Sequence, residues 1–204
     1  MKIIIVGTSY PFRGGLAAFN ERLAGEFMKQ GNEVEIYTFT LQYPSFLFPG
    51  KTQLSDDEAP RDLRINRRIN SVNPLNWVSV GREIKAKNPD KIIFCYWMAF
   101  MAPCFGTIAR FAKSAKTKSI ALVHNMIPHE PTILDKLFPA YFVKAMDGFV
   151  AMTASVVSDI NKFDKKYKPK LVSPHPIYDH YGAITPRSEA LDALDLDPAF
   201  RYIL

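Results

Sequence analysis

The segment that most constrains the fold is residues 2–31, where a short apolar run, a loop ending in glycines and an amphipathic pattern follow one another. The run covers residues 3–6, and the loop ends in Gly14 and Gly15. After them, apolar side chains recur at helical spacing before Gly31, at Leu16, Phe19, Leu23 and Phe27. A buried strand that leads through such a loop into a helix predicts an anion site, because backbone N–H groups and the helix dipole point outward there.

The spacing of the glycines in this loop excludes two common nucleotide motifs. Six residues separate Gly7 from Gly14, which does not match the G-x-G-x-x-G dinucleotide fingerprint. No Gly-Lys-Ser/Thr follows, so the loop is not a P-loop. Arg13 beside the glycines suits a phosphate or sugar hydroxyls that approach from outside. The alternative interpretation is that the glycines only form a turn.

Strand-like runs alternate with helix-like runs along the chain. We expect strands at 2–7, 34–39, 63–67, 91–96, 118–123, 148–152 and 171–173. We expect helices at 15–30, 75–87, 101–114, 133–146 and 153–166. The runs are rich in Ile, Val and Phe on both faces, which is typical of parallel strands covered on both sides. The predicted fold class is therefore α/β, a Rossmann-like doubly wound parallel sheet with helices on both faces.

Composition excludes several classes of protein. The chain has 204 residues, of which 48% are apolar and 23% charged, as in ordinary globular proteins. The first apolar run is too short for a signal peptide, and no run reaches the length of a membrane span. We therefore expect a cytoplasmic protein, in which Cys95 and Cys104 are reduced core residues.

The net charge of +6 is concentrated in two clusters. The first cluster contains Arg61, Arg64, Arg67 and Arg68, and the second contains Lys162, Lys165, Lys166, Lys168 and Lys170. Such clusters contact phosphorylated substrates or the anionic inner face of a membrane, or they form a solvated face. No nucleic-acid module accompanies them, so nucleic acid is not an expected partner.

The segment 40–60 is long for a loop and carries the large side chains Tyr43, Phe46, Leu47 and Phe48 around Pro44 and Pro49. Long loops in compact domains are usually functional. Its apolar tip could contact a membrane or a hydrophobic acceptor. The other interpretation is an ordinary loop held in place by aromatic packing.

Two further groups of candidate site residues follow strands, at the edge where open parallel sheets bind ligands. The segment 123–130, VHNMIPHE, brings together His124, Asn125, His129 and Glu130. His124 could donate a hydrogen bond to a reacting oxygen or orient an acceptor hydroxyl. No metal is predicted, because a proline separates the two histidines and no third ligand follows. Tyr96 and Trp97 end another strand, where they stack on a sugar or fill space between sheet and helix.

The composition changes after about residue 174. We predict a Rossmann-like domain at 1–175, a linker with a short helix at 176–200, and the first strand of a second, truncated domain at 201–204. Prolines flank His175 at the start of the linker, so this side chain is expected to fix domain orientation.

Taken together, the motifs resemble the N-terminal half of retaining glycosyltransferases of family 4 (group 1), which have a two-domain B-type fold. The matching pieces are P-F-R-G-G at 11–15, I-N-S-V-N-P at 69–74, Y-W at 96–97, V-H-N…P-H-E at 123–130 and P-H-P-I-Y-D at 174–179. The resemblance covers residues 1–180 and rests on the order of these pieces and their positions at strand ends.

The resemblance implies an activity and a set of roles. In that family the C-terminal domain holds most of the nucleotide-sugar donor, and the N-terminal domain mainly binds the acceptor. Gly14 and Gly15 are then expected near the donor phosphates or the acceptor, and His124 near the anomeric centre. The reaction would transfer a sugar from a UDP- or GDP-sugar to a glycan or lipid-linked acceptor with retention, without a metal or other cofactor.

The resemblance also implies that part of the site lies outside this sequence. The family's paired glutamates and diphosphate-gripping basic residues belong to the C-terminal domain. We therefore predict that residues 1–204 alone fold but do not turn over substrate. Two other functions stay open: a sugar-nucleotide epimerase that shares the two-domain fold, and a non-catalytic anion-binding module that associates peripherally with membranes.

Overall fold

The computed structural model describes residues 1–44, 53–55, 58–127, 134–176 and 183–202. All seven strands that the sequence predicts are present in one sheet. The strands are β1 (Lys2–Val6), β2 (Glu33–Leu41), β3 (Arg64–Asn70), β4 (Lys91–Tyr96), β5 (Lys118–Val123), β6 (Gly148–Ala151) and β7 (Lys170–Val172). The helices are α1 (Gly15–Lys29), α2 (Pro74–Ala86), α3 (Ala102–Ala112), α4 (Leu134–Ala145), α5 (Ala154–Phe163) and α6 (Arg187–Ala193), and a 3₁₀ turn, η2 (Ala99–Met101), precedes α3.

The sheet is parallel throughout, in the order β3-β2-β1-β4-β5-β6-β7. The chain moves from β1 toward one edge and then returns to build β4 on the other side of β1. Neighbouring strands β1 and β4 therefore form the topological switch point, where open α/β sheets bind ligands. The predicted doubly wound α/β fold is confirmed.

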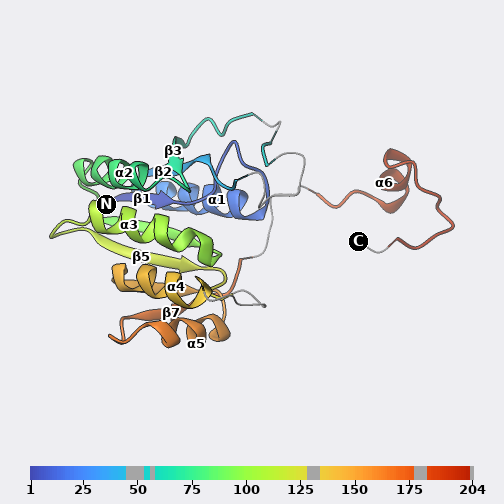
Figure 1. The fold of residues 1–204 in the computed structure, drawn as a ribbon. Coiled ribbons are helices and arrows are strands. Elements are labelled where there is room, and N and C mark those ends of the chain that lie inside the picture. The colour runs from blue at the N-terminus through green and yellow to red at the C-terminus, as the bar shows by residue number, and fades with distance from the viewer. Residues whose placement is uncertain (45–52, 56–57, 128–133, 177–182, 203–204) are drawn as a thin grey trace. The chain divides into compact units, whose positions relative to one another are not determined.

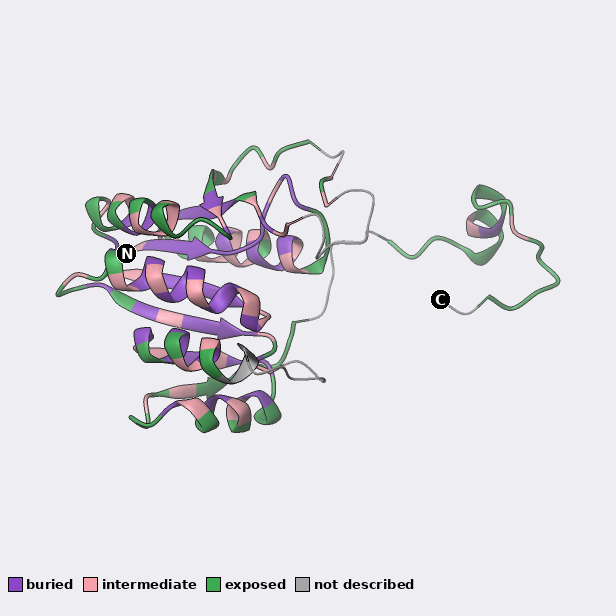
Figure 2. Ribbon diagram, viewed as in Figure 1, coloured by how far each residue is buried: buried purple, intermediate pink, exposed green. Residues whose placement is uncertain are grey.

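Helices cover both faces of the sheet, as Figure 1 shows. Apolar side chains of α1 form one core with β1 and β2. Side chains of α2, α3, α4 and α5 form the larger core on the opposite face. Strand residues of the central sheet are buried on both faces, as the colouring of Figure 2 shows. Cys95 and Cys104 lie in these cores as free thiols, as expected, and burial raises the pKa of each.

Local sequence signals mark the helix ends. Gly31 follows α1 with a φ of 78°, a conformation that favours glycine, so the predicted stop is confirmed. Asn73 caps α2 with its side chain, which accepts hydrogen bonds from the N–H groups of Leu75 and Asn76 at 3.0 and 3.2 Å. None of the helices in the described residues is long and apolar enough to span a membrane.

The chain divides into two compact units, Met1–Pro174 and His175–Leu204. The second unit contains α6, where the sequence predicts a short helix. Leu191 is buried in this unit, and the Arg187 guanidinium donates to the carbonyl oxygen of Phe200 at 2.8 Å.

Helices α2 and α3 pack closely against each other at Gly81. A Cβ atom at this position would lie 2.6 Å from the Cβ of Phe111 and 2.9 Å from the carbonyl oxygen of Ile108. Both atoms belong to α3, so neither can move without shifting the helix. Gly25 in α1 is the opposite case, because a Cβ there would meet nothing within 4 Å.

These two glycines give a matched test of the packing. Gly81→Ala is expected to lower the free energy of unfolding by about 1–3 kcal/mol, because α2 and α3 must separate. Gly25→Ala is expected to raise it by about 0.5–1 kcal/mol, because alanine loses less backbone entropy in a helix. Urea denaturation followed by circular dichroism measures both changes. Equal effects of the two substitutions would contradict the close approach at Gly81.

Candidate active site at the sheet switch point

The loop between β1 and α1 begins at the switch point and is held by buried polar contacts. The Thr38 hydroxyl on β2 accepts a hydrogen bond from the Ser9 N–H at 3.0 Å. Glu21, in the second turn of α1, accepts from the Ser9 hydroxyl at 2.9 Å and from the Tyr10 N–H at 2.6 Å. The Asn20 side chain donates to the Thr8 carbonyl oxygen at 2.8 Å. The polar side of α1 therefore fixes the loop that precedes it.

A second segment is hydrogen-bonded to the same loop. The N–H of Arg13 donates to the carbonyl oxygen of Gln53 at 3.0 Å, and the N–H of Ser55 donates to the carbonyl oxygen of Pro11 at 2.7 Å. This segment comes from the long stretch at 40–60, of which residues 45–52 and 56–57 lie outside the described residues. The described part of that stretch therefore supports the glycine loop.

Gly14 is the N-cap of α1 and has a φ of 107°, a conformation that L side chains rarely adopt. A Cβ on Gly14 would meet nothing within 4 Å, so the space beside it is open. The first intrahelical bonds run from the N–H groups of Ala17 and Ala18 to the Gly14 carbonyl oxygen. The N–H groups of Gly15 and Leu16 come before those bonds, at the positive end of the helix dipole.

His124 lies at the carboxyl end of β5 and contacts α1. Its N–H donates to the carbonyl oxygen of Tyr96 at 2.9 Å, which extends the β4–β5 pairing by one residue. Its imidazole meets the ring of Phe19 edge to face, with centroids 5.0 Å apart. Phe19 lies in the second turn of the helix that begins at Gly15. The structure therefore places the predicted histidine against the helix that carries the glycine loop.

The two aromatic residues after β4 have different positions. Tyr96 is fully buried, and its ring stacks on Phe142 at 4.5 Å, where it fills space between sheet and helix. Trp97 is half-buried, and its indole N–H donates to the Tyr43 hydroxyl at 2.7 Å. Burial raises the pKa of Tyr43, so this hydroxyl stays protonated. Trp97 thus connects the end of β4 with the chain that follows β2, whereas Tyr96 presents no ring face to a ligand.

The structure brings only some of the other predicted site residues near His124. Asn125 is exposed beside His124. His129 and Glu130 lie outside the described residues. His175 is exposed in the second unit. Among the described residues, no three His, Cys, Asp or Glu side chains gather closely enough to hold a metal ion.

The basic clusters of the sequence are largely engaged within the domain. The described ion pairs of these residues are Arg61–Glu58, Arg64–Glu33, Arg68–Glu83, Lys162–Asp159 and Lys170–Asp164. Lys168 donates to the carbonyl oxygen of Val143 at 2.7 Å. These contacts favour the solvated-face interpretation for most of the residues, and membrane contact stays a prediction.

Comparison with known proteins bears on the fold. No protein-family model and no curated sequence matches the chain. Among solved structures, UDP-GlcNAc 2-epimerase from Methanocaldococcus jannaschii superposes with a TM-score of 0.53 at 12% identity, over 85% of this chain and 46% of that one. UDP-N-acetylglucosamine 2-epimerase from Rickettsia bellii superposes with a TM-score of 0.55 at 14% identity, over 97% and 51%.

These similarities establish a fold and leave the activity open. The chain spans about half the length of the two enzymes. Its architecture is that of one Rossmann-like half of a two-domain B-type protein, so this part of the sequence-based expectation is confirmed. At such low identity nothing in the matches singles out family 4.

The contacts of Glu21 give a test of how the loop is held. Glu21→Ala leaves the buried Ser9 hydroxyl and the Tyr10 N–H without their acceptor, so the free energy of unfolding is expected to fall by about 1–3 kcal/mol. Amide hydrogen exchange across residues 9–14 is expected to accelerate. Glu26→Ala is the control, because Glu26 lies on the exposed side of the same helix. Unchanged exchange in the Glu21 variant would contradict this role.

Proposed function

We propose that this chain is the acceptor-side half of a nucleotide-sugar enzyme, and that the enzyme is a retaining glycosyltransferase. The observation that supports it is the contact between His124 and Phe19, with centroids 5.0 Å apart. The His124 imidazole thus lies against the helix whose N-terminus is the expected anion site. A group that handles protons and a group that binds anions then face one ligand.

In this proposal each described group has a role suited to its chemistry. The N–H groups at Gly14 and Gly15 stabilise the negative charge of the leaving nucleoside diphosphate. His124 donates a hydrogen bond to the sugar or orients the acceptor hydroxyl. The bond between C1 of the sugar and the diphosphate oxygen breaks, the acceptor oxygen bonds to C1 on the same face, and the acceptor proton passes to the leaving diphosphate oxygen. Arg13, Trp97 and Asn125 border the acceptor.

A second domain completes the site in this proposal. The donor is a UDP- or GDP-sugar, and the acceptor is a glycan or a lipid-linked sugar. Residues 1–175 supply the acceptor side, residues 176–200 are the linker, and residues 201–204 begin the donor domain. The expected absence of a metal requirement is tested by adding a chelator to the assay.

A specific observation also favours a second candidate function. The two solved structures compared with this chain are UDP-GlcNAc 2-epimerases, so the fold is as compatible with an epimerase as with a transferase. An epimerase changes the configuration at a ring carbon, whereas a transferase joins the sugar to an acceptor. Proton NMR of the full-length polypeptide with UDP-GlcNAc, UDP-glucose or GDP-mannose separates the two. A glycoside whose formation depends on acceptor supports the transferase, and an isomeric sugar formed without acceptor supports the epimerase.

The role of His124 gives a kinetic prediction. His124→Gln in the full-length protein is expected to lower kcat by about 100-fold or more, because the substitution removes a proton-handling group at the reacting centre. Lys162→Gln on α5 is the control, since Lys162 is exposed and pairs with Asp159. Initial rates of nucleoside diphosphate release measure both. Full activity of the His124 variant would remove this residue from the mechanism.

The division of the site gives another prediction. Residues 1–204 alone are expected to fold, as circular dichroism and a cooperative urea transition would show. The same polypeptide is expected to transfer no sugar in the NMR assay, because half of the donor site is missing. Transfer at a normal enzymatic rate by residues 1–204 would contradict the two-domain proposal.

A further inference from the structure

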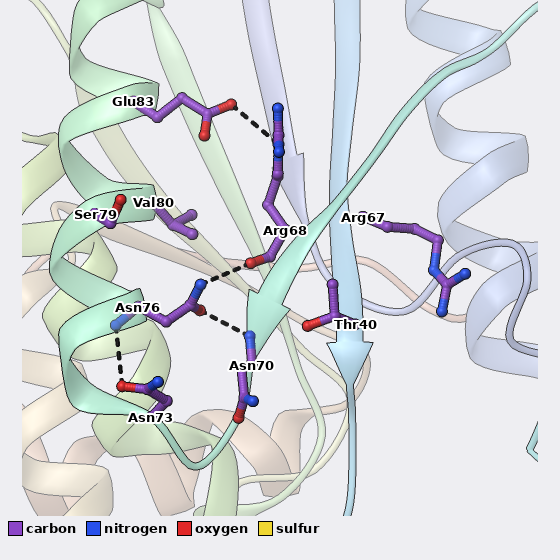
Figure 3. A pocket seen from close by; sticks show the side chains of 9 residues that line it. All are labelled: Thr40, Arg67, Arg68, Asn70, Asn73, Asn76, Ser79, Val80 and Glu83. Carbon is purple, nitrogen blue, oxygen red and sulfur yellow. Dashed lines mark hydrogen bonds and ion pairs between the residues drawn. The ribbon is translucent and has the colours of Figure 1, made fainter.

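A polar groove lies between the edge strand β3 and helix α2, separated from the switch point by β2. Its volume is about 330 Å³, within the range of small-molecule sites. The lining residues are Thr40, Arg67, Arg68, Asn70, Asn73, Asn76, Ser79, Val80 and Glu83, drawn in Figure 3. Nothing in the proposed function uses this groove.

Arg68 extends toward the groove from a β-bulge in β3. Arg67 pairs with Thr38 and Ile69 pairs with Phe39, so Arg68 has no partner residue in the β2–β3 register. Such an extra residue reorients the side chains around it. Ile69 is buried in the core under α2, and Arg68 reaches Glu83 on α2. Figure 3 shows Arg67 on the other side of the strand, pointing away from α2.

Glu83 orients the Arg68 guanidinium without covering it. Its Oε1 lies 3.7 Å from the Arg68 Nε and accepts a hydrogen bond from the Tyr37 hydroxyl at 2.8 Å. Burial raises the pKa of Tyr37, which keeps this hydroxyl a donor. Among the described residues, no acceptor binds the two terminal amino groups of Arg68. These amino groups form the fork that binds phosphate oxygens in pairs.

The acceptor atoms at the other end of the groove are already used. The Asn73 Oδ1 accepts from the N–H groups of Leu75 and Asn76, and the Asn70 Oδ1 accepts from the Val72 N–H at 3.1 Å. Within the described part of the chain, the Nδ2 groups of Asn70 and Asn73 have no acceptor.

Asn76 uses both ends of its amide on strand β3. Its Nδ2 donates to the Arg68 carbonyl oxygen at 2.9 Å, and its Oδ1 accepts from the Asn70 N–H at 2.7 Å. Apart from the second carboxylate oxygen of Glu83, the side-chain groups left over among the described lining residues are therefore mainly hydrogen-bond donors. A surface with surplus donors and an oriented guanidinium suits an anionic, oxygen-rich ligand.

We propose that this groove binds a small phosphate ester. The phosphate contacts the terminal amino groups of Arg68, and further ligand oxygens accept hydrogen bonds from the Asn70 and Asn73 amides and the Ser79 hydroxyl. Arg67 adds positive charge nearby without direct contact. The proposal is independent of the function at the switch point, because the groove shares no residue with it.

Calorimetric titration of the 204-residue chain with ribose 5-phosphate, and with ribose as the neutral counterpart, tests the proposal. Ribose 5-phosphate is expected to bind about tenfold more tightly or better, since only the ester offers a charged partner to Arg68. Equal binding of the two compounds, or no binding of either, would overturn the proposal.

Two substitutions locate the ligand. Arg68→Gln removes the guanidinium fork. Asn73→Asp keeps the helix cap, because aspartate caps equally well, but replaces a donor with a negative oxygen. Each is expected to weaken ribose 5-phosphate binding about tenfold or more. Arg64→Gln is the control on the same strand and should leave binding unchanged, because Arg64 lies outside the groove and pairs with Glu33.

Other outcomes distinguish binding in the groove from binding at the switch point. If Arg13→Gln abolishes binding and the groove variants do not, the ligand sits at the switch point and the groove proposal is overturned. If a groove variant fails to fold, NMR of the wild-type chain decides instead. Shifts of the Asn70 and Asn73 side-chain amides on adding ribose 5-phosphate support the proposal, and unshifted amides reject it.

Discussion

The candidate active site depends on how closely α1 can approach the sheet, and Gly7 permits that approach. A Cβ atom on Gly7 would lie 2.9 Å from both the Asn20 Nδ2 and the Cys95 Cβ, so a side chain there would clash with the amide of α1 and with strand β4. Because α1 packs close to the sheet, Phe19 lies against His124 and Glu21 lies against the loop at Ser9. Moving the helix would therefore disturb the loop, the imidazole and the anion-binding N-terminus together.

Polar contacts fix the position of α1 on the sheet. Apolar packing alone would let a helix slide or rotate on a sheet, since burial is not directional. Glu21 and Asn20 bind particular backbone groups of residues 8–10, which sets the position of the helix along its axis. The same contacts satisfy buried donors and acceptors of a loop that has no strand partner there.

Much of this arrangement could be predicted from the sequence, because chain order and apolar runs determine which residues lie at the carboxyl ends of parallel strands. The positions of Gly14 and His124 follow in this way. The anchoring role of Glu21 could not, because a glutamate in an amphipathic helix is usually exposed. For Tyr96 the sequence left open a sugar-stacking and a space-filling role, and its burial against Phe142 agrees with the second, because the last residue of a strand covered on both faces lies in the core. The bulge at Arg68 could not be anticipated, because the polar run at residues 66–68 of RINRRIN does not indicate which residue is the extra one.

The amide of Asn76 has a consequence for how this protein meets other copies of itself. Edge strands offer unpaired N–H and C=O groups on which a foreign strand can add, the first step toward aggregation. Here the side chain occupies the Asn70 N–H and the Arg68 carbonyl oxygen, two groups that an incoming strand would need. The carboxyl end of β3 is thus closed to sheet growth by one residue of the neighbouring helix, which protects the solubility of the folded chain at this edge.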